Sequence, residues 1–396
     1  MVEKGDEAVA GEVELRRLSA ALLTPVGRGA VATIRVHGDL SELDRRDAAL
    51  FHAANGRLLS QQQIGRIAFG RWGGESLDGE DVVVCRVNDD ALEIHCHGGD
   101  AAVRRILGDL EQAGCQTLDW HRQLADVSHA LEADCAERLS RATTWRTADI
   151  LHEQSSGLLR RAVEVLLQSI TDAASTSTVI PQLDALLEWS EFGLHLSQPW
   201  MVVLTGRPNV GKSSLINALL GYQRAIVFDQ PGTTRDVVTA ETAFDGWPVV
   251  LADTAGLRDA TEELEAAGIA LARQRLANAD ARLVLVDLNE PPTRDDESLI
   301  AQWSDAIVIG HKCDLGDRWQ GRLPTSAVRA SSVTGEGLEE IQRRLIERLI
   351  PRVPIPGTPI PITRRQSDLL GVARSELLSS NPSAAHQAIM KIISGN

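Results

Sequence analysis

The chain has 396 residues, of which 43% are hydrophobic, 24% charged and 4% aromatic, an ordinary composition for a soluble globular protein. This length predicts two or three domains, whose cores need no disulfide or structural metal. The formal net charge of −15 argues against a surface coated by polyanion, so nucleic acid would be held by a local patch or through a partner. Five cysteines without a CxxC pair, a charged start and no apolar run of about 18 residues predict a cytoplasmic protein without a membrane span.

Residues 1–120 are predicted to form a small mixed α+β domain. Val31–Val36 and Asp81–Val87 are rich in β-branched residues and predict strands. Asp100 is expected to cap a helix whose apolar residues recur at helical spacing, and Gly114 is placed to end that helix.

Residues 121–198 are predicted to be mainly helical. The apolar residues of 129–170 recur at helical spacing, and a helix is expected again over Leu183–Leu196. Thr171–Pro181, between them, is rich in Ser, Thr and Ala, and two interpretations stay open: a bend between helices or a short linker.

The pattern changes at Trp200, and residues 199–350 are predicted to form an α/β domain. Short apolar runs alternate there with helical segments, which favours a parallel sheet covered by helices on both faces. The predicted strands are Met201–Leu204, Val249–Ala252, Leu283–Val286 and Ile307–Ile309. In residues 351–396, Pro351–Pro361 predicts a stiff connector, and the tail is expected to be helical until Pro382 interrupts it.

Residues 206–213 read GRPNVGKS and match the phosphate-binding pattern GxxxxGK[ST], directly after a predicted strand and before a helix. The glycines let the backbone wrap around phosphates, and its N–H groups form an anion-binding nest. Lys212 is expected to reach the β- and γ-phosphates, and Ser213 to bind Mg²⁺. The alternative, an ordinary glycine-rich turn, is disfavoured by the complete motif. The predicted nucleotide-binding residues here are Gly206, Asn209, Val210, Gly211, Lys212, Ser213 and Ser214.

Two later segments are predicted to respond to the γ-phosphate. In Pro231–Asp236, Thr234 is expected to supply a second Mg²⁺ ligand, although a threonine-rich loop by itself is more often a solvated turn. The second segment closes the predicted strand Val249–Ala252 and would set a carboxylate beside the metal and a glycine beside the γ-phosphate. Its residues are Asp253, Thr254, Ala255 and Gly256.

A second pair of segments is predicted to read the base. Asp314, in His311–Asp314, can accept hydrogen bonds from both guanine N1–H and the exocyclic amine, a pair that adenine lacks. Lys312 and His311 belong to the same motif. Ser331, Ser332 and Val333 are placed to touch the guanine carbonyl. The order and spacing of these motifs predict GTP rather than ATP as the nucleotide.

Together these motifs resemble the translation-factor-like GTPases of the Era and Der superfamily. Thr24–Gly38 and Leu92–Gly99 resemble the two N-terminal motifs of the tRNA-modification GTPases, the MnmE/TrmE family. The resemblance implies a P-loop GTPase domain inserted in a helical domain, after an α+β domain that binds a tetrahydrofolate one-carbon donor and forms a homodimer. It implies GTP hydrolysis in modification of the tRNA wobble uridine with an FAD-dependent, MnmG-type partner, which would hold most of the tRNA.

The resemblance also assigns expected roles to side chains around the nucleotide. It implies that Asn209 holds K⁺ in place of an arginine finger, that dimerising GTPase domains complete this site, and that Glu265 orients the attacking water. The alternative for Glu265 is a solvated helix carboxylate. If Glu265 does orient the water, the expected catalytic residues are Glu265, Lys212 and Thr234. The expected K⁺ site is made by Asn209, Phe228, Gln230 and Thr233.

In the N-terminal domain, Arg35 and Glu93 fall at positions that match the family's folate site. An Arg can pair with the glutamate tail of folate and a carboxylate with its pterin edge. The alternatives are an edge-strand Arg and a surface Glu. His95 and His97 are expected to share one strand face without Cys96, which favours packing or hydrogen bonding at the following glycine turn over a metal site.

The chain departs from the family pattern at several positions. It reads Ile393–Asn396 where the family has Cys-Ile-Gly-Lys, Cys115–Gln123 does not match the family segment there, and His311 stands where the guanine motif usually has Asn. An imidazole can still donate a hydrogen bond. Cys96 is the only cysteine that we can suggest as a substitute for the C-terminal cysteine of the family. Two alternatives stay open: a divergent GTPase that has lost modification, and a GTP-controlled switch in, for example, ribosome assembly.

Overall fold

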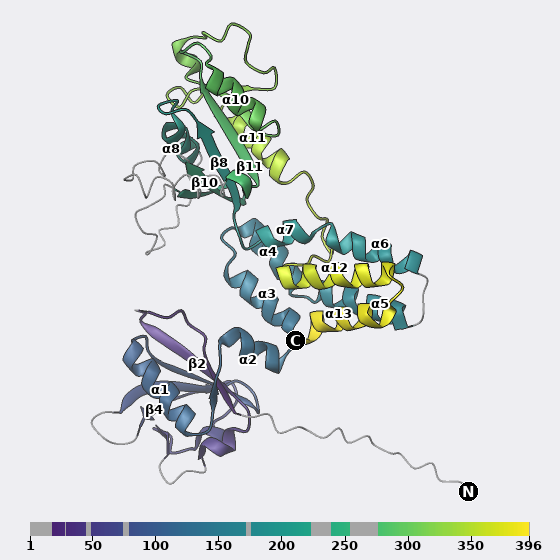
Figure 1. Ribbon diagram of the computed structural model, residues 1–396. Helices are drawn as coiled ribbons and strands as arrows, with labels where there is room; N and C mark the ends of the chain where they lie inside the picture. Colours follow the sequence, from purple (N-terminus) through teal and green to yellow (C-terminus); the bar gives the residue numbers. More distant parts are fainter. Residues whose placement is uncertain are drawn as a thin grey trace, which may run out of the picture. The chain divides into compact units, whose positions relative to one another are not determined.

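The computed structural model describes residues 18–27, 29–44, 49–73, 79–171, 176–222, 239–253 and 276–395 (Figure 1). The chain divides into two compact parts, an N-terminal unit of residues 1–133 and a C-terminal unit of residues 134–396.

The N-terminal unit is built on a seven-stranded sheet in the order β3-β4-β5-β6-β2-β1-β7, antiparallel except for the pair β1 and β7. Helix α1 (Asp100–Gln112) packs on one face, where Ile106 and Leu110 join the buried side chains of the strands. A second helix, α2, spans Trp120–Val127. The strands are β1 (Ser19–Leu22), β2 (Val31–His37), β3 (Phe51–Ala53), β4 (Ile67–Trp72), β5 (Glu80–Arg86), β6 (Ala91–His97) and β7 (Gln116–Thr117).

The sequence predictions for this unit are largely confirmed. The two predicted strands are β2 and β5, and the helix ends just before Gly114, whose φ of +93° suits glycine. One detail is wrong. Asp100 is the first helical residue, and Gly99 is the N-cap, without a side-chain hydrogen bond.

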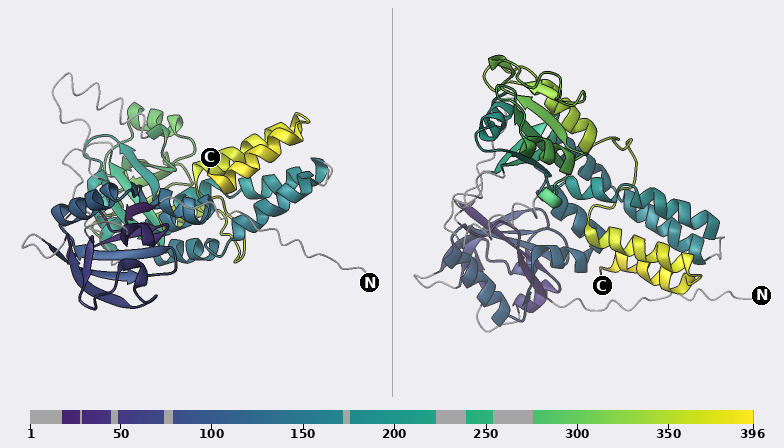
Figure 2. Two further views of the ribbon diagram at one scale, coloured as in Figure 1. Left: turned by 90° about the horizontal axis from the view of Figure 1, so that it is seen from below. Right: turned by 45° about the horizontal axis from the view of Figure 1, so that its top comes forward.

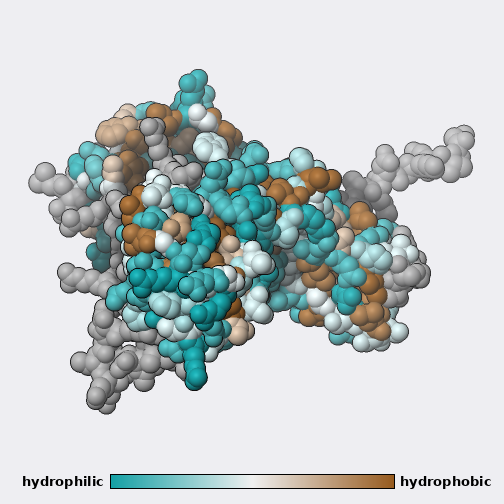
Figure 3. Space-filling view, turned by 90° about the horizontal axis from the view of Figure 1, so that it is seen from above, coloured by the Kyte–Doolittle hydropathy of each residue, from teal (hydrophilic) through white to brown (hydrophobic). Residues whose placement is uncertain are grey.

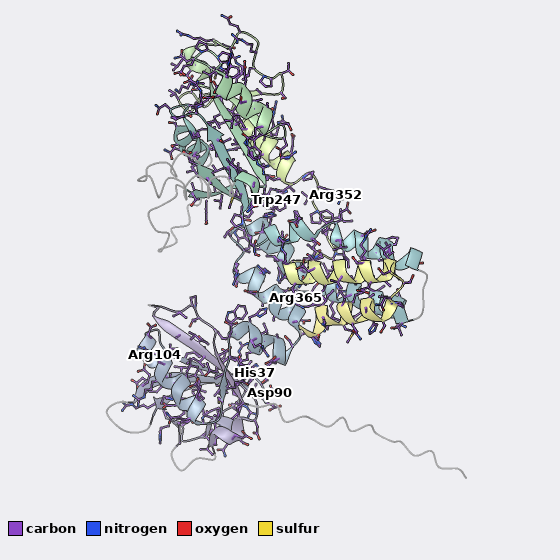
Figure 4. The ribbon with its side chains drawn as sticks, in the orientation of Figure 1. His37, Asp90, Arg104, Trp247, Arg352 and Arg365 are labelled. Carbon is purple, nitrogen blue, oxygen red and sulfur yellow. The ribbon has the colours of Figure 1, made fainter. Side chains whose placement is uncertain are left out.

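The C-terminal unit contains helices from two separate stretches of the chain, and Figures 1 and 2 show the yellow helices alongside the teal ones. Helix α12 packs on α6, α7 and α13, while α13 also packs on α5. Arg365 of α12, labelled in Figure 4, donates to Asp134 of α3 at 2.7 Å. The helices are α3 (Ala130–Ser140), α4 (Trp145–Gln154), α5 (Leu158–Thr171), α6 (Thr176–Leu187), α7 (Ser190–His195), α12 (Arg364–Leu378) and α13 (Pro382–Ser394).

Two prolines of this unit lie within or at the start of a helix. Pro181 lies inside α6, which begins at Thr176, so the second half of the expected bend or linker is helical. A proline near a helix start removes one backbone hydrogen bond, and the buried side chains of Val179 and Leu183 offset that loss. The predicted break in the helical tail is confirmed, because α12 ends at Leu378 and Pro382 begins a new helix, α13. Proline suits the first helical position, and the Asn381 side chain accepts from the N–H of Ala384.

The second sheet has six strands in the order β13-β12-β11-β8-β10-β9. Its four predicted strands are confirmed, but the sheet is mixed and not fully parallel, because β9 pairs antiparallel with β10 through the turn Asp245–Gly246. Both turn residues have positive φ, as a two-residue hairpin of this kind requires. The strands are β8 (Trp200–Gly206), β9 (Thr239–Phe244), β10 (Trp247–Asp253), β11 (Ala281–Asp287), β12 (Ile307–His311) and β13 (Val328–Ala330). The helices of this part are α8 (Lys212–Tyr222), α10 (Arg294–Gln302) and α11 (Leu338–Leu349).

The two ends of the parallel strands have different neighbours. At the amino ends, Trp247 of β10 (Figure 4) packs edge-on against Trp200 of β8 and Phe192 of α7, with ring centroids 5.7 Å apart in both pairs. Arg146 of α4 lies over the Trp247 ring at 4.6 Å. The helical segments therefore pack against the amino ends, and the carboxyl ends are left to position the candidate site.

The helices in the described ranges differ from membrane-spanning helices in length or in hydropathy. None of the helices there is both long enough and apolar enough to cross a bilayer. Figure 3 shows hydrophilic and hydrophobic residues intermixed on the face in view.

Residues 350–363, which include the predicted proline-rich connector, form neither helix nor strand.

Candidate nucleotide-binding site

The predicted phosphate-binding loop joins the carboxyl end of β8 to the first residue of α8. Asn209 and Gly211 have φ of +64° and +97°, so the backbone turns sharply there. The first N–H groups of α8 have no intrahelical partner, which suits an anion. The Lys212 side chain is 5% exposed, and its Nζ donates to the carbonyls of Gly206 and Arg207 at 3.1 and 3.0 Å. The lysine charge therefore lies against the loop that would hold the phosphates.

Beside this loop, Ser213 and Asp253 bring two hard oxygen donors together. Strands β8 and β10 run parallel, and the Ser213 hydroxyl donates to Asp253 Oδ2 at 2.8 Å. Asp253 is buried at the last position of β10, whereas Ser213 is exposed. A hydroxyl and a carboxylate at this separation fit Mg²⁺, which prefers oxygen ligands and keeps several waters.

His311, at the end of β12, joins two loops of the site. It is 3% exposed, its Nδ1 lies 2.8 Å from the carbonyl oxygen of Val210, and its Nε2 lies 2.6 Å from Ser332 Oγ. A carbonyl only accepts, so Nδ1 carries the proton and Nε2 accepts from the hydroxyl. Burial lowers the pKa of His311, which keeps the ring neutral.

Lys312 holds the phosphate-binding loop from the next position in the chain. Its backbone has a left-handed φ of +60°. Its Nζ donates to the carbonyl of Asn209 at 2.9 Å and to Asp287 Oδ2 at 2.6 Å. Two successive carbonyls of the loop, those of Asn209 and Val210, thus accept hydrogen bonds from two successive side chains at the carboxyl end of β12.

The remaining residues of the predicted base-reading segments have different surroundings. Asp314 is exposed in the short helical turn Cys313–Leu315, where its carboxylate is open to a base. Ser331 is fully buried, and its hydroxyl accepts from the N–H groups of Val333 and Thr334, so it shapes the loop. Ser332 bonds His311, and Val333 is 86% exposed. Of this segment, the exposed residue Val333 is the one that remains open to a ligand.

Two contributors were missed at the sequence level. Arg207 donates to Asp296 Oδ1 of α10 at 2.8 Å and to Glu290 at 3.1 Å, which anchors the start of the phosphate-binding loop. Asp287, buried at the end of β11, holds Lys312. The signal for Asp287 was available, because it is the acidic residue that ends the apolar run Leu283–Val286 at the carboxyl edge.

Several predicted site residues lie outside the described residues. These are Phe228, Gln230, Thr233, Thr234, Thr254, Ala255, Gly256 and Glu265. The predicted K⁺ site, the second Mg²⁺ ligand and the water-orienting carboxylate therefore stay predictions.

In the N-terminal unit, the two predicted folate residues lie directly opposite each other on β2 and β6. They form an ion pair, in which Arg35 Nε donates to Glu93 Oε1 at 3.2 Å. Strands β2 and β6 are interior strands of the sheet, so Arg35 does not lie on an edge strand. Both side chains are partly exposed, and Glu93 is paired with Arg35 instead of being a separate surface carboxylate.

The neighbouring histidines share one face, as predicted, and Cys96 faces the core. Their partners differ from the expected glycine turn: His95 Nδ1 lies 3.0 Å from Thr33 Oγ1, and His97 Nδ1 lies 2.5 Å from Glu80 Oε1. Burial, with a smaller effect of the Glu80 charge, raises the pKa of the Cys96 thiol to about 11. The thiol is therefore protonated near neutral pH, which argues against a reactive role.

Comparison with known proteins places these motifs in a family. Residues 201–312 match the family model described as 50S ribosome-binding GTPase. The tRNA modification GTPase MnmE of Prochlorococcus marinus (strain MIT 9313) is 30% identical, with 93% of this chain and 89% of the relative covered. The protein of that name from Geobacillus kaustophilus (strain HTA426) is 31% identical, with 83% and 81% covered. That from Synechococcus sp. (strain WH7803) is 33% identical, with 83% and 80% covered. The chain belongs to the MnmE family of tRNA modification GTPases.

Proposed function

We propose that this chain binds and hydrolyses GTP and acts, with an FAD-dependent partner of the MnmG type, in modification of the wobble uridine of tRNA. The observation that carries the proposal is the joined carboxyl edge of the second sheet. There Lys212 and the pair Ser213–Asp253 stand ready for phosphate and Mg²⁺. His311 links the carbonyl of Val210, in the phosphate-binding loop, to Ser332.

In this proposal the chain lowers the barrier to hydrolysis by neutralising charge on the phosphates. The N–H groups at the start of α8 and the Lys212 ammonium would receive the phosphate oxygens. Ser213 and Thr234 would hold Mg²⁺, with Asp253 beside Ser213, and the ion would supply positive charge that neutralises the phosphates. Glu265 would orient the attacking water.

K⁺, held by Asn209 with Phe228, Gln230 and Thr233, would take the place of an arginine finger. Asn209 is exposed and has a left-handed φ, so its side chain can reach a ligand beside the loop. We expect hydrolysis to be faster in K⁺ than in Na⁺, and Asn209→Ala to remove this difference while nucleotide binding persists. Equal initial rates in the two salts for the unchanged chain would refute the K⁺ role.

The N-terminal unit is proposed to bind a tetrahydrofolate one-carbon donor and to form a homodimer. The cross-strand register sets Ile67, Cys85, Glu93 and Arg35 in one row, so they share a sheet face. Ile67 and Phe69 of β4 are 77% and 56% exposed on that face, which supports an apolar contact with a second copy. Because the chain carries a net charge of −15, we assign most of the tRNA contact to the partner.

The test is the mass of the wobble uridine in tRNA from a strain that lacks this protein. We expect the unchanged chain to restore the modified base, and Lys212→Ala, produced at the same level, to leave it unmodified. If neither chain restores the base while purified protein hydrolyses GTP, the modification role is wrong and the GTPase role stands.

A second candidate is a GTP-controlled switch in ribosome assembly, without modification chemistry. It is favoured by the description of the matching family model and by the buried, protonated Cys96 thiol. Cosedimentation with 50S subunits that depends on a GTP analogue, together with no binding of methylene-tetrahydrofolate, would support this candidate over the first.

A further inference from the structure

The carboxyl end of β12 holds the phosphate-binding loop and the loop 331–333 at the same time. His311, the last residue of this strand, accounts for the link by itself, since its two ring nitrogens bond to the carbonyl of Val210 and to the hydroxyl of Ser332, at 2.8 and 2.6 Å. Val210 follows β8 and Ser332 follows β13, so one strand end joins two separate loops.

The ring is also packed tightly against the phosphate-binding loop. A Cβ added at Gly211 would lie 2.4 Å from His311 Cε1 and 2.5 Å from Nδ1, closer than atoms can approach. Gly211 therefore makes room for the imidazole. The ring itself is 3% exposed.

These contacts leave the imidazole no free nitrogen. To reach a base, it would have to give up a buried hydrogen bond to Val210 or to Ser332, and the abandoned partner would lose its own bond. A contact between His311 and guanine is therefore disfavoured, although the motif around it is predicted to read the base.

We infer that His311 is a positioning residue: it sets the phosphate-binding loop against the loop 331–333, so nucleotide affinity depends on it but the choice of base does not. This inference rests on the proposed function, because it takes the site to hold a guanine nucleotide. Choice of base is left to Asp314, whose exposed carboxylate is open to the ligand.

The experiment compares dissociation constants for GDP, inosine diphosphate and 7-deaza-GDP, which lacks the N7 acceptor of the base. His311→Ala should weaken all three by the same factor, about tenfold to a hundredfold for two lost hydrogen bonds. Ser332→Ala, which removes one bond and keeps the ring, should weaken all three equally and by less. His311→Asn should recover part of the affinity, because an amide can both donate and accept.

Asp314→Asn is the matched control and should change the ratios between nucleotides. If His311→Ala weakens GDP more than 7-deaza-GDP, the ring reads the base and the inference is wrong. Unchanged affinities in Ser332→Ala and His311→Ala also overturn it. If His311→Ala does not fold, as judged by thermal unfolding, Ser332→Ala and His311→Asn decide between the same outcomes. An unchanged chain that binds none of the three nucleotides would instead refute the proposed function.

Discussion

The carboxyl edge of the second sheet and the face of the N-terminal sheet that carries Arg35 and Glu93 position their polar groups in different ways. At the carboxyl edge, Lys312 and His311 bond to the loop of Asn209 and Val210, so segments more than a hundred residues apart are joined before a ligand binds. On the N-terminal sheet, Arg35 and Glu93 bond to each other across adjacent strands. The loops that would bind a nucleotide are therefore held in place before it binds. Folate, in contrast, would have to share or replace the existing ion pair of Arg35 and Glu93.

This difference has an energetic consequence. Groups that are already held in place lose little freedom when a ligand binds, so more of the interaction energy becomes affinity. A partly exposed ion pair contributes about 0–1 kcal/mol to stability, so breaking it for a ligand costs little, but its geometry gives little guidance to that ligand.

The largest effect is expected for Lys212→Ala. It removes the buried ammonium at the phosphate-binding loop, and GTP hydrolysis should fall by about 100- to 1,000-fold because charge on the phosphates is no longer neutralised. Phosphate release measures this directly. Lys391→Ala removes an exposed lysine of α13 and should leave the rate unchanged. A Lys212→Ala protein that folds and keeps its activity would show that the carboxyl edge of the second sheet is not the catalytic site.

Asp314→Asn should change which base is preferred. The amide would lose the pairing with guanine N1–H and the amine, and would suit the extra carbonyl of xanthine, so we expect GTP affinity to fall by about 100-fold and xanthosine triphosphate to be preferred. Competition binding measures the ratio. Asp317→Asn, at a carboxylate that pairs with Arg329, is the control and should leave the ratio as it is. An unchanged ratio in Asp314→Asn would place base recognition elsewhere.

A smaller effect is expected on the N-terminal sheet. If the Arg35–Glu93 pair opens to receive folate, Arg35→Ala should weaken methylene-tetrahydrofolate binding by about tenfold, the share of one charge-assisted hydrogen bond. Fluorescence titration measures this. Arg71→Ala removes the arginine of another ion pair on the same sheet, that with Asp81, and should not change it. Equal affinities for the two variants and the unchanged chain would assign the Arg35 pair to structure alone.

The smallest effect concerns pH. Burial lowers the pKa of His311 in the folded chain and Lys312 adds to this, while the Val210 carbonyl, Asp287 and Asp314 oppose it. The unfolded chain therefore binds the proton more readily, so the contribution of His311 is complete above its ordinary pKa of about 6.5 and is lost as pH falls below it. His311→Asn should reduce the drop in Tm between about pH 7.5 and about pH 5.5. A drop that is the same in both proteins would exclude His311 as its source.

The sequence predicts the carboxyl edge well because each motif is local. The spacing in GRPNVGKS and the four predicted strands give the course of the backbone around the phosphates without knowledge of the tertiary fold. The missed strand β9 had a signal as well, since Asp245–Gly246 is a typical two-residue hairpin turn between apolar segments.

Tertiary contacts could not be predicted in the same way. The roles of His311 and Arg207 depend on partners far away in the chain, Val210 and Ser332 for the first and Asp296 for the second. Pro181 lies within a helix because buried neighbours outweigh its local preference, which no short window of sequence reveals. The ion pair of Arg35 and Glu93 followed from strand register, which the sequence leaves open.

The most direct test of the account is a comparison of GTP and ATP hydrolysis by the purified chain, in the presence of Mg²⁺ and K⁺, with phosphate release as the readout. With Lys212 held against the phosphate-binding loop and Asp314 exposed at the carboxyl edge, we expect turnover of GTP and none of ATP above the Lys212→Ala background. Equal turnover of both nucleotides, or none of either, would contradict it.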